Sequence, residues 1–354
     1  MQEFKIALYP GDGIGLEVTP EAVKALRAIE PAATAKFIFT ELEWGIRYWK
    51  QHGIVVPEDY LTQLRAFDAI FLGAIGWPEL VPDHISLVPL ISIRQTFDQY
   101  ACIRPCKLLP GVETPLAGRP EIDFVIVREN SEGEYVDSGG VFHRDSPEEV
   151  ALQTSVHTRR GIERILRYGF RLAQSRRKKL TMATKSNALK NSMVLWDRVF
   201  AEVRKEFPDV ESDKAHIDAL SMYLVQAPSR YDVIVASNLF GDILSDLGGG
   251  LVGSLGLTPS ANINPERNAP SLFEPVHGSA PDIAGRGLAN PVAAVRSAAL
   301  MLEFLGLADA ARAIESGVDA YLADDGPKTK DLGGTANTSA AGDAIVAKIM
   351  RFVE

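Results

Sequence analysis

The sequence predicts a protein of the α/β class, and three observations carry that prediction. Short apolar, strand-like runs alternate with amphipathic helical segments along the chain. Several of these runs end in a polar or glycine-containing turn, and ligand sites gather at such strand ends in α/β proteins. The chain has 354 residues, and hydrophobic cores stop growing at roughly 250 to 300 residues, so we expect two domains.

The predicted elements follow one another from the N-terminus. A strand over residues 6–9 precedes an amphipathic helix over residues 17–29, and a second strand is expected over residues 36–40. Further short strand-like runs lie at residues 69–72, 123–127, 180–183 and 233–236. The uncharged stretch from Leu247 to Pro265 is crowded with Gly, Asn, Ser and Pro, so we interpret it as a glycine-rich loop and not as a membrane span.

Composition narrows the class of function. The chain carries 37 Lys and Arg against 46 Asp and Glu, a net charge of -9, which disfavours a nucleic-acid partner. Two cysteines, Cys102 and Cys106, are too few for a disulfide framework or a zinc site. The first residues lead directly into a strand-like run without a signal-peptide pattern, so we expect a cytoplasmic protein with no membrane partner.

A glycine-rich segment, Pro10-Gly11-Asp12-Gly13-Ile14-Gly15, joins the first strand to the first helix. Glycines at such a turn let the backbone approach a dinucleotide, but the spacing departs from G-x-G-x-x-G. The ribose-binding acid that this pattern needs has only Glu41 as a candidate. The alternative is a tight strand-to-helix turn that uses glycine for positive φ. Both interpretations stay open at this point.

Three arginines, Arg94, Arg104 and Arg128, lie near the ends of predicted elements. A guanidinium group offers a planar fork that holds a carboxylate through two hydrogen bonds, which lysine cannot do. In an acidic protein this arrangement favours a dicarboxylic or tricarboxylic acid as ligand. Each arginine taken alone is more typical of a surface or ion-pair residue, and the sequence does not show whether the three converge.

A pair of aspartates follows the strand that ends at Ala236. If Asn238 caps the next helix, Asp242 and Asp246 share one helix face, where like charges four residues apart repel by roughly 0.2 to 0.5 kcal/mol. A cation between them would remove that repulsion, and oxygen ligands suit magnesium or manganese. Asp218, just past another strand-like run, is a candidate third ligand. The alternative is that both carboxylates are solvated on an exposed edge.

Four motifs, in this order, resemble those of the metal-dependent β-decarboxylating dehydrogenases, the family of isocitrate, 3-isopropylmalate, homoisocitrate and tartrate or D-malate dehydrogenases. They lie at residues 11–15, 127–130, 238–247 and 273–285. The strings at residues 76–78, 81–86, 97–100 and 261–267 are most similar to the tartrate/D-malate branch. The resemblance implies an isopropylmalate dehydrogenase-like fold, with a mostly parallel sheet flanked by helices. It also implies a cleft between a large domain (1–99 and 256–354) and a small domain (100–255).

The resemblance implies roles for particular residues. Arg94, Arg104 and Arg128 would hold the substrate carboxylates of a small dicarboxylic acid. Asp218, Asp242 and Asp246 would bind Mg²⁺ or Mn²⁺. The resemblance also allows an additional monovalent cation. Tyr135 would be the acid that protonates the enolate, and Lys185, with its ammonium form disfavoured by nearby cations, the base. In the family Lys185 and Asp218 reach the site from the neighbouring subunit, so a homodimer with shared active sites is implied.

Cofactor binding is assigned by the same resemblance to the loop at residues 277–290. The contacts implied there are His277, Gly278, Ser279, Ala280, Asp282 and Asn290. A carboxylate at Asp282 would accept hydrogen bonds from the ribose hydroxyls and repel a 2'-phosphate, so NAD is expected over NADP.

The segment from Ser86 to Arg94 departs from the tartrate branch. It is one residue shorter, contains Pro89, and carries the apolar Leu90 and Ile91, as in the isopropylmalate branch. An extra carboxylate of isocitrate would be unpaired against these side chains, at a cost of several kcal/mol. We therefore expect D-malate or tartrate, with 3-isopropylmalate or another alkylmalate as the alternative. A catalytically silent carboxylate-binding protein is disfavoured because the candidate catalytic and metal-binding residues are all retained.

Overall fold

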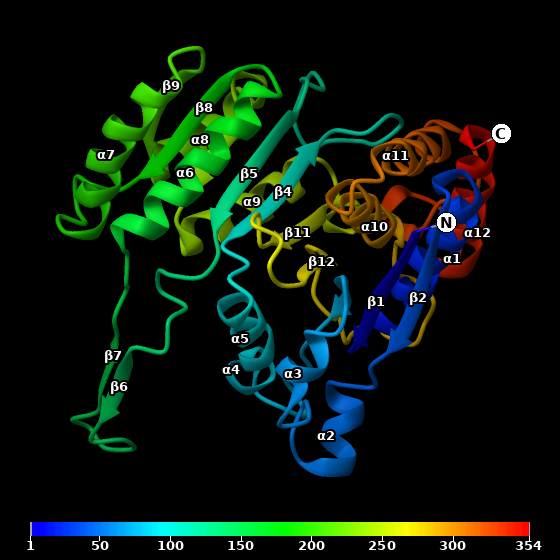
Figure 1. The fold of residues 1–354 in the computed structure, drawn as a ribbon, viewed down its shortest axis with the longest axis horizontal. Helices are drawn as coiled ribbons and strands as arrows, with labels where there is room; N and C mark the ends of the chain where they lie inside the picture. Colours follow the sequence, from blue (N-terminus) through cyan, green and yellow to red (C-terminus); the bar gives the residue numbers. More distant parts are fainter. Residues whose placement is uncertain (1, 354) are drawn as a thin grey trace.

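The computed structural model describes residues 2–353, and its main feature is one ten-stranded sheet covered by helices (Figure 1). The strand order across the sheet is β2-β1-β3-β12-β11-β4-β5-β10-β8-β9. The bounds, in that order, are Ala35–Glu41, Gln2–Gly11, Ala69–Ala74, Ser271–Pro275, Pro259–Ile263, Ala101–Lys107, Asp123–Glu129, Val233–Ala236, Lys179–Thr184 and Glu211–His216.

The pairing pattern changes in the middle of the sheet. Both outer parts are parallel, whereas β12-β11, β11-β4 and β4-β5 pair in antiparallel fashion. The β11-β4 pair, with Ile263 opposite Ala101, joins strands from the two predicted domains into one continuous sheet. The predicted α/β class with a mostly parallel sheet is confirmed, and the division at residues 99/100 and 255/256 stays a prediction.

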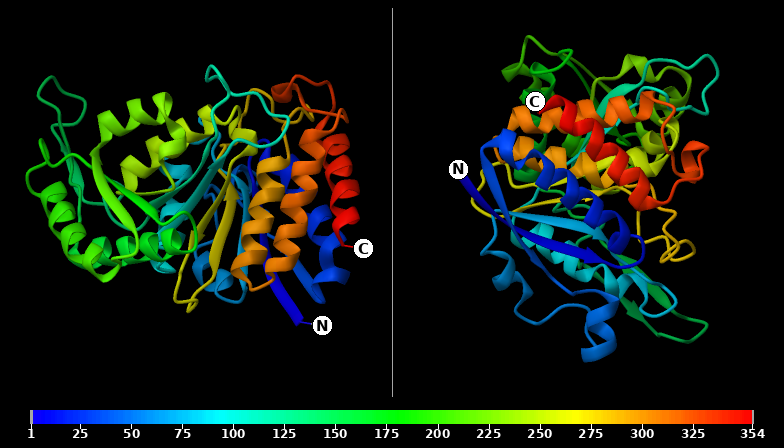
Figure 2. Two further views of the ribbon diagram at one scale, coloured as in Figure 1. Left: turned by 90° about the horizontal axis from the view of Figure 1, so that it is seen from above. Right: turned by 90° about the vertical axis from the view of Figure 1, so that its right-hand side faces the viewer.

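Helices cover both faces of the sheet. The N-terminal half contributes α1 (Gly15–Ala33), α2 (Ile46–His52), α3 (Tyr60–Leu64), α4 (Asp83–Ser86), α5 (Val88–Thr96) and α6 (Arg159–Gln174). The C-terminal half contributes α7 (Ser192–Val203), α8 (Ile217–Gln226), α9 (Asn238–Leu251), α10 (Val292–Phe304), α11 (Ala308–Ala323) and α12 (Thr338–Ile349). Helices α1, α10, α11 and α12 pack side by side near both chain ends (Figure 2). Among the described residues, no helix combines the length and the apolar character that crossing a membrane requires.

Strand β5 shows why the middle of the chain forms a buried sheet. Its alternate residues Val125 and Val127 belong to the apolar cluster that contains α6 and α7. Phe124 and Ile126 belong to a second cluster, which contains residues of α8 and α9. Because helices cover both faces, the strand is apolar at every position from 124 to 127 and reads as a continuous hydrophobic run.

The predicted strands and the first helix are confirmed, but the interpretation of Leu247 to Pro265 as a loop is wrong. Helix α9 continues to Leu251, and residues 259–263 form β11. The glycines in this helix permit close packing: a Cβ atom at Gly248 would lie 2.4 Å from Cys106 Sγ, and one at Gly249 would lie 2.4 Å from Leu255 Cδ2. The glycines of α9 therefore reflect tight packing, and the residues between α9 and β11 form turns and a short 3-10 helix.

A hairpin of β6 (Gly139–Phe142) and β7 (Val150–Gln153) lies apart from the main sheet. It projects away from the body of the molecule (Figure 1). Its apolar side chains are exposed, with Phe142 at 56% and Leu152 at 55% of full accessibility. This surface is unusually apolar for a part of the chain with so little packing against it.

Candidate active site

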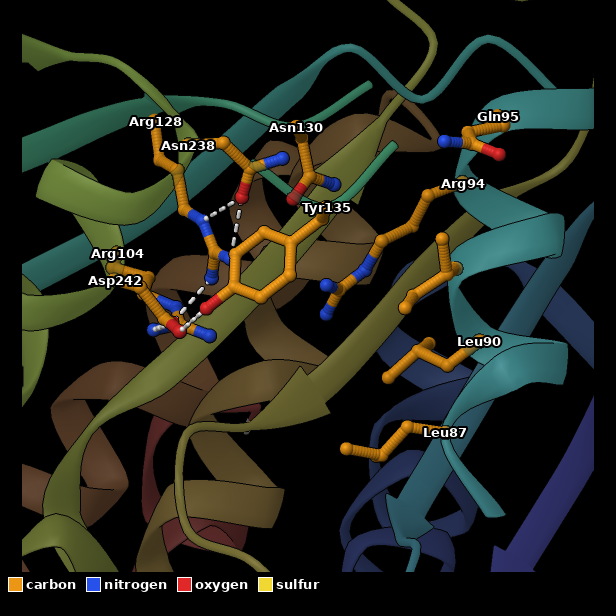
Figure 3. Close-up of a pocket in the computed structure, with 11 residues that line it drawn as sticks. Leu87, Leu90, Arg94, Gln95, Arg104, Arg128, Asn130, Tyr135, Asn238 and Asp242 are labelled. Carbon is orange, nitrogen blue, oxygen red and sulfur yellow. Dashed lines mark hydrogen bonds and ion pairs between the residues drawn. The ribbon is translucent and has the colours of Figure 1, made fainter. Parts of the chain in front are cut away.

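The three arginines predicted to bind carboxylates meet in one cavity of about 190 Å³. Its walls come from α5, from β4 and β5, from the loop after β5, and from the start of α9 (Figure 3). The lining residues are Leu87, Leu90, Ile91, Arg94, Gln95, Arg104, Arg128, Asn130, Tyr135, Asn238 and Asp242. The position fits the rule that α/β sites form beyond strand ends, because Arg128 and Asn130 lie where β5 ends.

Arg128 is held by two residues of α9. Its Nε and Nη2 atoms donate to Asn238 Oδ1 at 3.0 and 2.6 Å, and Nη1 donates to Asp242 Oδ1. The prediction that Asn238 caps α9 is wrong: Ser237 is the N-cap residue, and no side chain caps the helix. The Asn238 side chain instead accepts from Arg128 and donates to the Glu132 carbonyl at 2.9 Å, because a buried guanidinium needs acceptors more than the helix end does.

Arg104, on the neighbouring strand β4, is directed at the same carboxylate. Its Nη1 lies 3.0 Å from Asp242 Oδ1 and 3.9 Å from Asp246 Oδ1, and it donates to Ser245 Oγ at 2.6 Å. The side chains of Arg104 and Arg128 are only 7% and 3% exposed. Two buried guanidinium groups thus share one aspartate, which leaves an excess of positive charge facing the cavity.

This charge arrangement shifts the pKa values of the site. Burial opposes ionisation of Asp242, but the guanidinium groups of Arg128 and Arg104 outweigh it and hold the pKa of that carboxyl below its usual range. Tyr135 donates its hydroxyl to Asp242 Oδ2 at 2.9 Å. Burial and the Asp242 carboxylate raise the pKa of Tyr135. The tyrosine therefore keeps its proton across the neutral range.

Arg94 approaches the cavity from the opposite side, on α5. Its Nη2 atom donates to Glu274 Oε1 at 2.9 Å, at the end of β12. The same carboxylate oxygen accepts from Asn262 Nδ2 at 2.7 Å. Arg94 is thus oriented by one acid and retains donors for a ligand.

The remaining wall is apolar. Leu90 and Ile91 of α5 line the cavity as predicted, and Leu87, just before the helix, extends the same wall. Figure 3 shows Leu87 and Leu90 on the α5 side and the Arg104–Asp242 pair on the other. A ligand here would meet Arg104 and Arg128 at one side, and Arg94 together with the aliphatic groups at the other.

The predicted metal ligands are divided between two places. Asp242 lies in the cavity, and Asp246, one helical turn further along α9, is 62% exposed. Asp218 instead pairs with Lys185 at 2.7 Å, at the start of α8, and neither residue lines the cavity. Within residues 2–353 of one chain, no three His, Cys, Asp or Glu side chains are grouped closely enough to hold a metal ion.

A second cavity, of about 510 Å³, contains part of the predicted cofactor loop. Its walls include His277, Ala280 and Asn290, together with Ile14 from the glycine-rich segment. Gly13, at φ +54°, packs so tightly on this loop that a Cβ atom would lie 2.0 Å from the Ser279 carbonyl oxygen. The glycines therefore make the positive-φ turn considered above, and this turn supports the 277–290 loop.

Not all of the predicted cofactor contacts face that cavity. Ser279 is buried, whereas Gly278 and Asp282 are exposed and do not line it, and neither does Glu41. His277 Nδ1 lies 3.0 Å from the Gly278 carbonyl, so Nδ1 carries the proton and the buried Nε2 is an acceptor without a partner. Burial lowers the pKa of the His277 imidazole. A neutral histidine with a free acceptor suits a ligand hydroxyl.

Comparison with known proteins agrees with this arrangement. Residues 5–345 match the family model described as isocitrate/isopropylmalate dehydrogenase. The chain belongs to the isocitrate/isopropylmalate dehydrogenase family. It is 50% identical to D-malate dehydrogenase (decarboxylating) of Escherichia coli, over 99% of this chain and 100% of that protein. It is 52% identical to a probable tartrate dehydrogenase/decarboxylase of Agrobacterium vitis, over 99% and 98% of the two chains.

Solved structures place the fold in the same family. The crystal structure of isocitrate dehydrogenase from Methylococcus capsulatus superposes with a TM-score of 0.89 at 38% identity, and the match covers 99% of this chain and 100% of that one.

Four residues that line the arginine cavity of the present chain are not among the predicted site residues, namely Leu87, Gln95, Asn130 and Asn238. Asn130 and Asn238 each lie in a motif already noted, so the motif was the available signal.

Proposed function

We propose that this protein is an NAD-dependent and divalent-metal-dependent dehydrogenase that oxidises a 2R-hydroxy dicarboxylic acid, D-malate or tartrate, with loss of carbon dioxide where decarboxylation is available. The observation that carries the proposal is the convergence of Arg94, Arg104 and Arg128 on one cavity beside Tyr135 and Asp242. The names of the relatives from Escherichia coli and Agrobacterium vitis support this choice of substrate.

The residues of the cavity would bind the substrate carboxylates, select the substrate and supply a proton. Arg104 and Arg128 present buried guanidinium groups to one carboxylate of the substrate, and Arg94 presents its free donors to another. The cavity excludes a carboxylate from the side formed by Leu87, Leu90 and Ile91, because an ion there would have no partner. Tyr135, which keeps its proton, would donate it to the carbon left by decarboxylation.

The donor chemistry of α9 fits a divalent metal ion. Asp242 and Asp246 offer hard oxygen ligands, and we propose that Asp218 of a second copy completes the set, with Lys185 of that copy as the base. When bound, the ion would polarise the substrate hydroxyl and then the new ketone. Lys185 and Asp218 pair at 2.7 Å outside the cavity, with side chains that are 27% and 67% exposed. This accessibility supports a role toward a second copy.

The proposed homodimer has further support in the surface of the chain. Met222 and Val225 of α8 and Ile243 of α9 are 47%, 43% and 54% exposed, and the β6-β7 hairpin is apolar as well. Burying such side chains contributes roughly 25 cal/mol per Å². We propose that these surfaces form the subunit contact, with two domains of residues 1–99 plus 256–354 and 100–255 in each subunit.

For the cofactor, we propose NAD bound to the loop at residues 277–290. The unpartnered His277 Nε2 supports this, because a ribose hydroxyl can donate to it. The carboxylate of Asp282 would disfavour the 2'-phosphate of NADP. Two buried, free thiols, Cys102 and Cys106, are in keeping with the reducing cytoplasmic location that we propose.

A second substrate class has one observation in its favour. The apolar wall of Leu87, Leu90 and Ile91 would also accept the alkyl group of 3-isopropylmalate. One added apolar group changes discrimination by only about 10 to 200-fold, so activity on alkylmalates as a side reaction fits the same site.

The test is NADH formation by the purified protein with Mn²⁺ or Mg²⁺. The assay compares D-malate, the tartrate isomers, 3-isopropylmalate and isocitrate in parallel. Each acid is tested in the presence and in the absence of a metal chelator. We expect metal-dependent turnover that is fastest with D-malate or tartrate. Fastest turnover of 3-isopropylmalate would transfer the assignment to the alkylmalate class, and absence of metal-dependent turnover with every acid would contradict the proposal.

A further inference from the structure

One arginine outside the cavity connects its two walls. Arg164, on α6, donates through Nη1 to both carboxylate oxygens of Asp98, at 2.7 and 2.9 Å. Its Nη2 atom donates to Ser131 Oγ at 2.7 Å. The guanidinium carbon lies 4.1 Å from the centre of the Tyr100 ring. Arg164 therefore has a fixed plane and two separate partners, neither of which lines the cavity.

The first partner determines where α5 ends. Asp98 lies two residues beyond the helix, in a left-handed conformation with φ +46°. The turn that it forms returns the chain to the helix, because the Gln99 amide donates to the Arg94 carbonyl at 2.8 Å. Holding Asp98 thus holds the last turn of α5, from which Arg94 enters the cavity.

The second partner determines the course of the loop that carries Tyr135. Ser131 Oγ donates to Glu129 Oε1 at 2.7 Å, and the Glu132 amide donates to Glu129 Oε2 at 2.8 Å. Glu129 is the last residue of β5 and is only 2% exposed. Ser131 is therefore tied both to the sheet and to Arg164, four residues before Tyr135.

We propose that Arg164 is a positioning residue that fixes the distance between the α5 wall and the Tyr135 loop across the substrate cavity; this inference rests on the proposed function. One planar guanidinium reaches both walls, so neither can shift without breaking a charge-assisted hydrogen bond. Displacements of about 1 Å far from the chemistry can reduce turnover about a hundredfold, so such a residue acts on catalysis without touching the substrate.

The test compares Arg164→Met and Arg164→Lys with Arg167→Met as the matched control. Arg167 lies on the same helix and pairs with Glu206 and Glu163 at 2.9 and 3.2 Å on the outer surface, away from the cavity. All proteins are assayed for kcat and KM with D-malate and with 3-isopropylmalate, and their amide hydrogen exchange is followed at Gln99 and Glu132.

We expect Arg164→Met to lower kcat/KM for D-malate about tenfold to a hundredfold. The ratio of 3-isopropylmalate to D-malate activity should rise, because the α5 wall is no longer held close. Exchange at Gln99 and Glu132 should accelerate together. Arg164→Lys should recover the Asp98 contact, with slow exchange at Gln99 and fast exchange at Glu132. Arg167→Met should change kcat/KM by less than about threefold, as for other surface pairs.

Two results would overturn the proposal. One is a folded Arg164→Met protein with unchanged substrate ratio and unchanged exchange at both amides. The other is an equal loss of kcat/KM in the Arg164→Met and Arg167→Met proteins.

If Arg164→Met does not fold, Ser131→Ala replaces it. We expect this variant to show faster amide exchange at Glu132 but not at Gln99, and a lower kcat. An unchanged exchange rate and an unchanged kcat would refute the positioning role. If the wild-type protein oxidises none of the acids, the proposed function fails, and the exchange data still decide the positioning role.

Discussion

Two ion clusters in this molecule contain the predicted catalytic and metal-binding residues, and they differ in burial. In the cavity, Arg128 and Asp242 have side chains that are 3% and 34% exposed. The Lys185–Asp218 pair lies outside the cavity, and its side chains are 27% and 67% exposed. The first cluster is built into the core of one chain, whereas the second is available to another molecule. The difference is what the proposed site shared between two chains requires.

The two clusters should also differ in what they contribute to stability. In the cavity, loss of a buried donor leaves a buried acceptor without a partner, which costs about 1 to 3 kcal/mol. An exposed pair contributes about 0 to 1 kcal/mol. Substitutions in the first cluster should therefore affect folding and activity together, and substitutions in the second should affect activity alone.

The largest expected effect comes from Arg128→Met. It leaves the buried Asn238 Oδ1 without its two donors, whereas Asp242 keeps Arg104 and Tyr135. We therefore expect the free energy of unfolding to fall by about 1 to 3 kcal/mol. Turnover should fall at least about a hundredfold, since a developing charge loses its partner. Urea unfolding and NADH formation measure the two effects. Lys185→Met is the control, with the same loss of turnover and an unchanged unfolding midpoint; equal destabilisation by both substitutions would refute the contrast between the clusters.

A smaller effect is expected from pH. The pKa of Asp242 is below its ordinary value of 3.8 in the folded protein. Its ionised form therefore stabilises the fold above that pH, and the contribution is lost as pH falls through the lower, folded value. The difference in unfolding free energy between wild type and Asp242→Asn should shrink as pH is lowered from 5 to 3. Asp218→Asn should show a weaker trend, because water screens that pair. A difference that grows toward low pH would contradict the assignment.

Much of the fold could be predicted from the length and spacing of the apolar segments. The strands can be recognised because helices cover both of their faces, which makes runs such as residues 124–127 continuously apolar. The helix and strand between Leu247 and Pro265 could not be recognised, because Gly248 and Gly249 are required by close contacts with Cys106 and Leu255. The local sequence does not reveal those contacts.

For the candidate site, the sequence indicates the residues that face the cavity but not the residues that orient them. The family resemblance implies Arg94, Arg104, Arg128, Tyr135 and Asp242 as site residues, and the structure brings these five together in one cavity. The residues that orient them were missed, because Asn238 and Glu274 act through contacts between distant segments. Asn238 was assigned to a helix cap on local grounds, whereas the buried Arg128 determines its orientation. Asp282 was expected at the cofactor cavity and is exposed beside it.

The central claim is that two chains together complete one active site, and mixing two inactive variants tests it most directly. Tyr135→Phe alters the cavity half, and Lys185→Met alters the half offered to the second copy. The two proteins are purified separately, dissociated together and reassociated, and NADH formation with D-malate is measured. We predict recovery to about a quarter of wild-type activity, because about half of the dimers are mixed and each has one site with both residues intact. Activity no higher than the mean of the two variants alone would contradict the shared site.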